Sequence, residues 1–270
     1  TISAVEKAAS SEEDANLIAK VVAVASDELV NKVIEEVSKN ATDEKEALSA
    51  KVMQSIVLTN PDKIDKLSDE NKDIMIKQTI NAAKNQNENK DDVNDDLADV
   101  IADIIVEADV DTAGQLLQEL DQTELDDNSD LNLSIIIKLS EKDLFEEKLE
   151  VISIKNPLNE SSIENLIVNS INEAKDNDNL EVITDLVIED QGLIVETMIE
   201  ASEKDEEDKQ NVLEIITQVV EKDPEKAIEI IQENKNTEDS AEIIVTKIEN
   251  GEAITIDDFE DVFDTNISPN

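Results

Sequence analysis

The residue types that could do chemistry in this chain are almost all carboxylates. The nearest approach to a known ligand pattern is ADVDTAGQLLQEL at residues 108–120. Asp109 and Asp111 stand at the first and third positions of a calcium-binding loop. The fifth position, which needs an oxygen ligand, is Ala113, and the twelfth, which needs a bidentate Glu, is Leu120. We therefore expect a helix-to-helix turn with capping carboxylates, and Ca²⁺ binding is the alternative.

A second stretch, GEAITIDDFEDVF at residues 251–263, looks like the end of a calcium loop. Counting back along the pattern puts Lys247 at the first ligand position. A lysine there would repel the cation, so we do not expect a calcium-binding loop at this place.

Runs of neighbouring carboxylates occur elsewhere in the chain. They are typical of solvated helix faces or of helix N-termini, where the macrodipole favours anions. Hard cations need only oxygen ligands, so low-affinity binding of Ca²⁺ or Mg²⁺ is the alternative. We predict no cofactor and no firmly held metal; the weak Ca²⁺ or Mg²⁺ candidates are Asp109, Asp111, Asp126, Asp127 and Asp130.

The missing residue types argue against an enzyme. The chain has no His, Cys, Arg, Trp or Tyr, and only three Phe. An imidazole base and a cysteine nucleophile are thereby excluded. Paired carboxylates could serve a glycosidase, but three Phe cannot line a sugar cleft. Thr1 could act as an N-terminal nucleophile, but the residues after it show no sign of a pocket, and we expect a processed or trimmed chain.

Charge restricts the partners. The chain of 270 residues carries 69 acidic side chains and 23 lysines, for a formal net charge of -46. This charge opposes binding to nucleic acid and to anionic membranes, because both present phosphates. No run of about 20 apolar residues occurs, so no membrane insertion is expected.

Residues 40, 132, 159 and 266 are Asn residues that begin N-x-S/T triplets, a weak glycosylation signal in an Asn-rich chain.

Hydrophobic spacing predicts an all-α fold, with a strand-containing fold as the less favoured alternative. Val212, Ile216, Val219 and Val220 form one helical stripe. The predicted core is made of Ile, Leu, Val and Ala, and methionines fill its gaps. Pro residues after cap-type residues suit first helical positions. The predicted helix N-caps are Ser26, Asn60, Asp109, Ser140, Asp190 and Asp223.

These caps reveal a repeat. Successive spacings alternate between short and long (34, 49, 31, 50 and 33), and every second cap recurs after 83, 80, 81 and 83 residues. The pattern predicts an α-solenoid-like array of three units of about 82 residues with about five helices each. The predicted helices start near 12, 26, 43, 60 and 71, then near 93, 111, 128, 140 and 161, and then near 178, 191, 206, 223 and 238.

The predicted domains follow from this array. An N-terminal extension (1–11) precedes unit 1 (12–92), unit 2 (93–177) and unit 3 (178–250), and a C-terminal docking or capping segment (251–270) follows. Repeat arrays need their ends covered by a cap or by a neighbour. We expect the apolar strip of the last segment either to cap its own chain or to dock head-to-tail on another copy; the predicted interface residues are Ile254, Ile256, Phe259, Val262 and Phe263.

Two functional hypotheses follow. The first is a non-enzymatic structural protein, the subunit of an extracellular or cell-surface filament, sheath or surface layer that assembles with itself. The alternative is a soluble solenoid adaptor that binds a basic protein partner on an acidic concave face. A filament subunit should sediment as large particles, whereas an adaptor should be monomeric and retain cationic peptides.

Overall fold

The computed structural model of the chain describes residues 18, 21–22, 25–37, 43–64, 66–88, 96–123, 130–143, 145–189, 193–202, 206–235, 238–255, 258 and 262. The chain divides into two compact units, Thr1–Leu166 and Ile167–Asn270, and the boundary falls within the long helix α10. The three-unit division predicted from the repeat stays a prediction.

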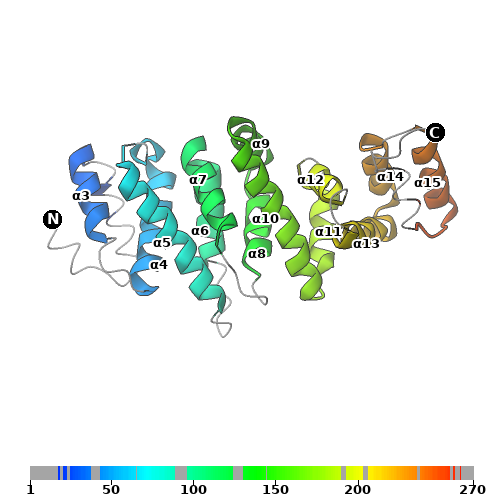
Figure 1. The fold of residues 1–270 in the computed structure, drawn as a ribbon, viewed down its shortest axis with the longest axis horizontal. Helices are drawn as coiled ribbons and strands as arrows, with labels where there is room; N and C mark the ends of the chain where they lie inside the picture. Colours follow the sequence, from blue (N-terminus) through cyan, green and yellow to red (C-terminus); the bar gives the residue numbers. More distant parts are fainter. Residues whose placement is uncertain are drawn as a thin grey trace. The chain divides into compact units, whose positions relative to one another are not determined.

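The described residues form helices and turns and contain no strand, so the predicted all-α class is confirmed. Figure 1 shows the helices in chain order. The first unit contains α3 (Asp27–Val37), α4 (Asp43–Thr59), the 3₁₀ turn η1 (Pro61–Lys63), α5 (Asp69–Glu88), α6 (Asp96–Glu107), α7 (Val110–Asp121), α8 (Leu131–Ser140) and α9 (Phe145–Lys155). The remaining helices are α10 (Pro157–Asp176), α11 (Leu180–Glu189), α12 (Leu193–Ser202), α13 (Glu206–Lys222), α14 (Pro224–Glu233) and α15 (Glu238–Asn250).

Local signals explain where several helices begin and end. Asp109 caps α7 by accepting hydrogen bonds from the backbone N–H groups of Asp111 and Thr112, and Asp223 accepts from that of Lys226 at the start of α14. Both predicted caps are thus confirmed. At the end of α15, Gly251 has φ +68°, a left-handed conformation that closes the helix and suits glycine.

Two predicted starts are wrong. The helix expected near residue 60 is only the 3₁₀ turn η1, because the chain bends at once to bury Ile64 and Leu67. Ser140 is the last residue of α8 and not an N-cap, since its hydroxyl donates to the carbonyl of Ile137. The next helix begins at Phe145, where an aromatic side chain enters the core.

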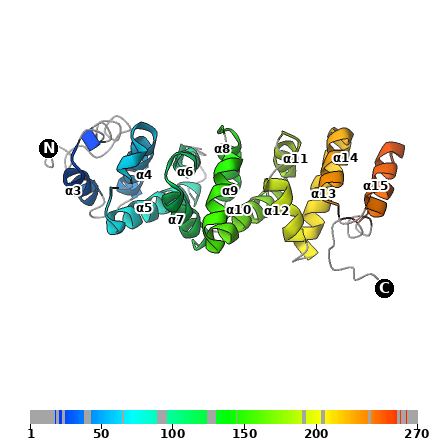
Figure 2. The ribbon, with the colours of Figure 1, turned by 90° about the horizontal axis from the view of Figure 1, so that it is seen from above.

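In the first unit the helices form two layers. Helix α4 packs on α6 and α6 on α8, while α5 packs on α7 and α7 on α9. Figure 2 shows α4, α6 and α8 along one side and α5 and α7 along the other. In the second unit α13 packs against α11, α12 and α14, and α14 packs on α15.

The core consists almost entirely of aliphatic side chains, as the composition predicts. Met53, Met75 and Met198 are fully buried and fill gaps between branched residues, and Phe145 is also buried. Helices such as α3 and α14 bury one stripe and expose acidic residues on their other faces, whereas α6 and α8 are buried over most of their surface.

Hydrogen bonds between helices recur at a regular distance along the chain. The Asn71 amide bonds to Asn31, which lies 40 residues earlier, Gln118 donates to Asn159 over 41 residues, and Asn211 donates to Asn172 over 39 residues. Contacts at this distance join one helix pair to the next pair. The period of contact is therefore about half of the repeat predicted from the sequence.

Candidate binding site

An open groove of about 460 Å³ lies in the second unit, between the end of α10, the start of α11 and one face of α13. Its lining residues are Lys175, Asp178, Leu180, Glu181, Glu214, Gln218, Glu221 and Lys222. The turn after α10 positions one side of the groove. In this turn Asp178 adopts a left-handed conformation (φ 54°), and Leu180 then begins α11. On α13, four lining residues recur at helical spacing and so share one face: Glu214, Gln218, Glu221 and Lys222.

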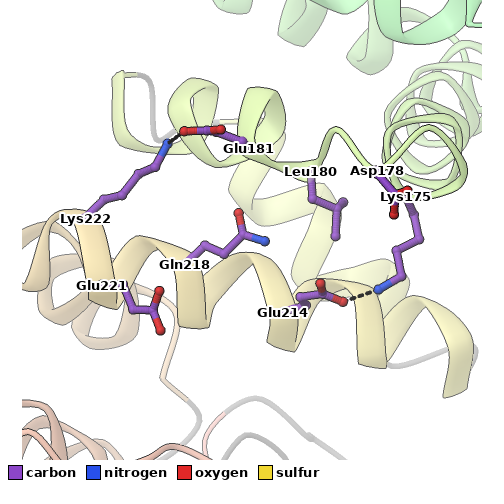
Figure 3. A pocket seen from close by; sticks show the side chains of 8 residues that line it. All are labelled: Lys175, Asp178, Leu180, Glu181, Glu214, Gln218, Glu221 and Lys222. Carbon is purple, nitrogen blue, oxygen red and sulfur yellow. Dashed lines mark hydrogen bonds and ion pairs between the residues drawn. The ribbon is translucent and has the colours of Figure 1, made fainter.

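Two lysines, each paired with carboxylates of another helix, span the groove. Lys175 on α10 pairs with Glu214 on α13, and the Lys222 ammonium lies 2.9 Å from a carboxylate oxygen of Glu181 and 2.7 Å from one of Asp185. Figure 3 shows Leu180 and Gln218 between these two lysines. The hydrogen bonds that Lys222 donates to Asp185 and Glu181 raise the pKa of this lysine above its ordinary value.

The groove is acidic, and its two lysines pair with carboxylates of the protein itself. Four carboxylates and two lysines line it, and both lysines are engaged by carboxylates of neighbouring helices. The lining has no hydroxyl or thiol nucleophile and no imidazole, so acyl-transfer chemistry has no residues here. What the groove can offer is electrostatic complementarity to a cationic group.

The structure separates the predicted metal candidates. The Asp109 carboxylate is committed to capping and also accepts a hydrogen bond from the Thr112 hydroxyl, while Asp111 pairs with Lys155 at 3.0 Å. Asp130 directly precedes α8, and Asp126 and Asp127 lie outside the described residues. Among the residues that the structure describes, no three Asp or Glu side chains gather closely enough to hold a metal ion.

The C-terminal segment is tied to α15 by an ion pair. The Lys247 ammonium lies 2.5 Å from a carboxylate oxygen of Asp258, which also accepts hydrogen bonds from the Thr255 backbone N–H and hydroxyl. Burial raises the pKa of Asp258, but the bonds from Lys247 and Thr255 outweigh it, so the pKa is lowered. Lys247, which stands at the first ligand position of the calcium-loop pattern, thus pairs with Asp258 of the same stretch.

The predicted interface residues fall into two groups. Val262 is fully buried within its own chain and Ile254 is half-buried. Ile256, Phe259 and Phe263 lie outside the described residues. Docking of this strip on another copy stays a prediction.

Two of the N-x-S/T asparagines are buried. Asn132 and Asn159 expose only 5% and 3% of their surface, and the Asn159 amide donates to the Ile152 carbonyl. Neither side chain is therefore accessible to a glycan-transferring enzyme in the folded chain. Asn40 and Asn266 lie outside the described residues.

Sequence reasoning missed a set of lysines that reach across to the preceding helix pair. Lys63 donates to the Ala25 carbonyl, and Lys148 donates to the Ala108 carbonyl. Lys142 contacts Asp99 at 2.6 Å and Asp103 at 2.8 Å. Their partners lie 38 to 43 residues away, so no local sequence pattern identifies these contacts.

The pKa values of Lys142 and Lys148 are shifted in opposite directions, although burial disfavours the charged form of both. Burial lowers the pKa of Lys148, whose partner is a neutral carbonyl, although Asp109 and Glu107 lie close enough to oppose the effect. Burial also disfavours the charged form of Lys142, but hydrogen bonds to Asp103 and Asp99 outweigh it and raise the pKa.

The chain matches no family model, no curated protein and no solved structure. Within the described part of the chain, every helix is too short or too polar to cross a bilayer.

Proposed function

We propose that this chain is a non-enzymatic α-helical repeat protein that acts as a scaffold and binds basic protein partners on its acidic surface. The observation that carries the proposal is the use of its lysines. In the described residues, Lys142, Lys175 and Lys222 each pair with carboxylates of a neighbouring helix. Lysines that pair with neighbouring helices in this way link the helices to one another. The electrostatic potential at the protein surface then stays strongly negative.

The repeated contacts support a solenoid of the kind that carries such surfaces. Lys63 and Lys148 make the same lysine-to-carbonyl contact, to Ala25 and Ala108. The two lysines lie 85 residues apart and the two alanines 83, close to the predicted period of about 82 residues. Repeats that contact mainly their neighbours give extended faces, and these commonly serve recognition. The lack of His, Cys, Arg and Tyr in the whole sequence supports a role without catalysis.

The test combines sedimentation with titration. We expect purified protein to sediment as a monomer and to bind fluorescently labelled oligolysine at physiological ionic strength, with affinity that falls as salt increases. Labelled oligoglutamate is the control and should not bind. Failure to bind oligolysine would overturn the electrostatic part of the proposal.

The same sedimentation run tests the filament hypothesis. Large particles of purified protein that persist in physiological salt would favour a self-assembling subunit over an adaptor. An extracellular or cell-surface location also remains a prediction, and surface labelling of intact cells would check it.

A further inference from the structure

Helix α9 presents apolar side chains on two faces, and only one of these faces is covered. Phe145, Leu149 and Ile152 are buried in the core. Val151 and Ile154 lie on the other side of the helix and are 48% and 85% exposed.

A third exposed apolar side chain lies just past the end of α9. Leu158, in the first turn of α10, is 62% exposed. Val151 and Ile154 share one face of α9 by their spacing, and Leu158 lies four residues further along the chain, just past the turn at Asn156. Among the described residues, three of the five large apolar side chains that are exposed lie in this short stretch. We call these three residues the α9–α10 apolar stripe.

Carboxylates border the stripe. Glu147, Glu150 and Glu160 are exposed and belong to the same two helices. The two lysines of α9 do not neutralise them, because Lys148 donates to the Ala108 carbonyl and Lys155 pairs with Asp111. The surface therefore combines apolar contacts with negative charge.

We infer that the α9–α10 apolar stripe is a docking surface for a basic amphipathic helix of another protein. The inference rests on the proposed function and names the partner and the place. A helix of this kind would lay its apolar face on Val151, Ile154 and Leu158 and direct lysines or arginines at the bordering glutamates. A second copy of this chain is the poorer occupant, because it carries a net charge of -46 and would bring more carboxylates to an acidic border.

The direct test uses the full chain and a labelled amphipathic helix of leucine and lysine, with binding followed by fluorescence anisotropy. The matched peptide has the same composition in an order that mixes the two residue types around the helix. We expect the amphipathic peptide to bind at least tenfold more tightly than the mixed one. Equal affinity for both peptides would overturn the docking surface but leave the proposed electrostatic binding standing.

Variants locate the contact. Ile154→Asp places a charge on an already exposed position, so folding should be unaffected, and it should weaken binding of the amphipathic peptide at least tenfold. Ile243→Asp on α15 is the matched control, since Ile243 is also apolar and 55% exposed, and it should change affinity less than twofold. Oligolysine should bind both variants almost as it binds the original chain, to within the effect of one added charge.

Two outcomes would contradict the inference. The first is an equal loss of amphipathic-peptide binding in Ile154→Asp and Ile243→Asp. The second is a chain that dimerises in sedimentation at high salt and becomes monomeric on Ile154→Asp, which would assign the stripe to a second copy. If neither oligolysine nor the amphipathic peptide binds, the proposed function fails together with the inference.

Discussion

Helix α7 and the start of α10, in the first unit, are joined by different chemistry from helices α11 and α13 in the second unit. The first contact uses an amide: Gln118 donates to the side-chain oxygen of Asn159 at 2.6 Å, and Asn159 is 3% exposed. The second uses the ion pairs of Lys222 at the edge of an open groove, where this lysine is 35% exposed.

The difference shows how a highly acidic chain can hold neighbouring helices together. A buried amide pair is neutral, so salt and the field of the other carboxylates affect it little. An exposed ion pair between acidic helices offsets local repulsion, but its own net contribution is small and screened by salt. We expect buried amide pairs to contribute most to the free energy of unfolding. Exposed ion pairs should mainly reduce repulsion between acidic helices at the groove.

The largest expected effect is at Asn159. Asn159→Ala leaves the Gln118 amide and the Ile152 carbonyl without their partner, and we expect a loss of about 2–3 kcal/mol in the free energy of unfolding. Urea denaturation measures it. Asn165→Ala is the control, because Asn165 is exposed and donates only to Asp121, so its loss should stay below about 1 kcal/mol. Equal losses would show that burial of the amide is unimportant.

The next effect tests the packing around the same amide. A Cβ atom at Gly114 would lie 2.6 Å from the Asn159 side-chain nitrogen, which is closer than van der Waals contact allows. Gly114→Ala should therefore destabilise the chain by about 1–2 kcal/mol even though alanine favours helix. In an Asn159→Ala background the close atoms are gone, and Gly114→Ala should be neutral or stabilising. Additive losses in this double-mutant cycle would contradict the predicted contact.

Lys142 lies between the two extremes, because its side chain is 23% exposed and that of its partner Asp103 is 13% exposed. Lys142→Gln should cost about 1–2 kcal/mol at neutral pH. Its pKa is raised in the folded chain, so its contribution is complete below the ordinary lysine value of about 10.4 and disappears as the pH rises through the folded pKa. Denaturation curves of the original chain and the variant should converge at high pH, and a constant gap would contradict the assignment.

Lys148 should behave with the opposite sign. Its pKa is lowered by burial, so its protonation disfavours the folded state, and stability should rise as the pH increases through its folded pKa. Lys148→Met should remove this rise and serves as the comparison for Lys142→Gln in the same pH series.

The smallest expected effect is at the groove. Lys222→Gln removes two exposed ion pairs, and we expect a small decrease in the melting temperature at low salt that disappears at about 1 M salt. The original chain should itself become more stable over this range, because salt screens its net charge of -46. A decrease that persists at high salt would mean that Lys222 contributes by packing rather than by charge.

Residue types and their spacing were enough to predict the helical class and many helix boundaries, and they show that the chain has no imidazole and no thiol. Predicted starts at 43, 206 and 238 coincide with α4, α13 and α15, and Asp109 and Asp223 cap helices as expected. These features depend on residue types and on spacings of a few residues, so periodicity and cap preference are enough to predict them.

Which polar residues meet becomes visible only in the folded chain. Nothing near Asn159 in the sequence distinguishes it from the many exposed asparagines, and its burial depends on Gln118 and Gly114 of another helix. The lysines that reach across to the preceding helix pair find their partners about 40 residues away. No sequence pattern shows which neighbouring helix each of these side chains contacts. The α9–α10 apolar stripe could not be predicted from the sequence for the same reason. Helix α9 has apolar residues on two faces, and packing alone decides which of them is covered.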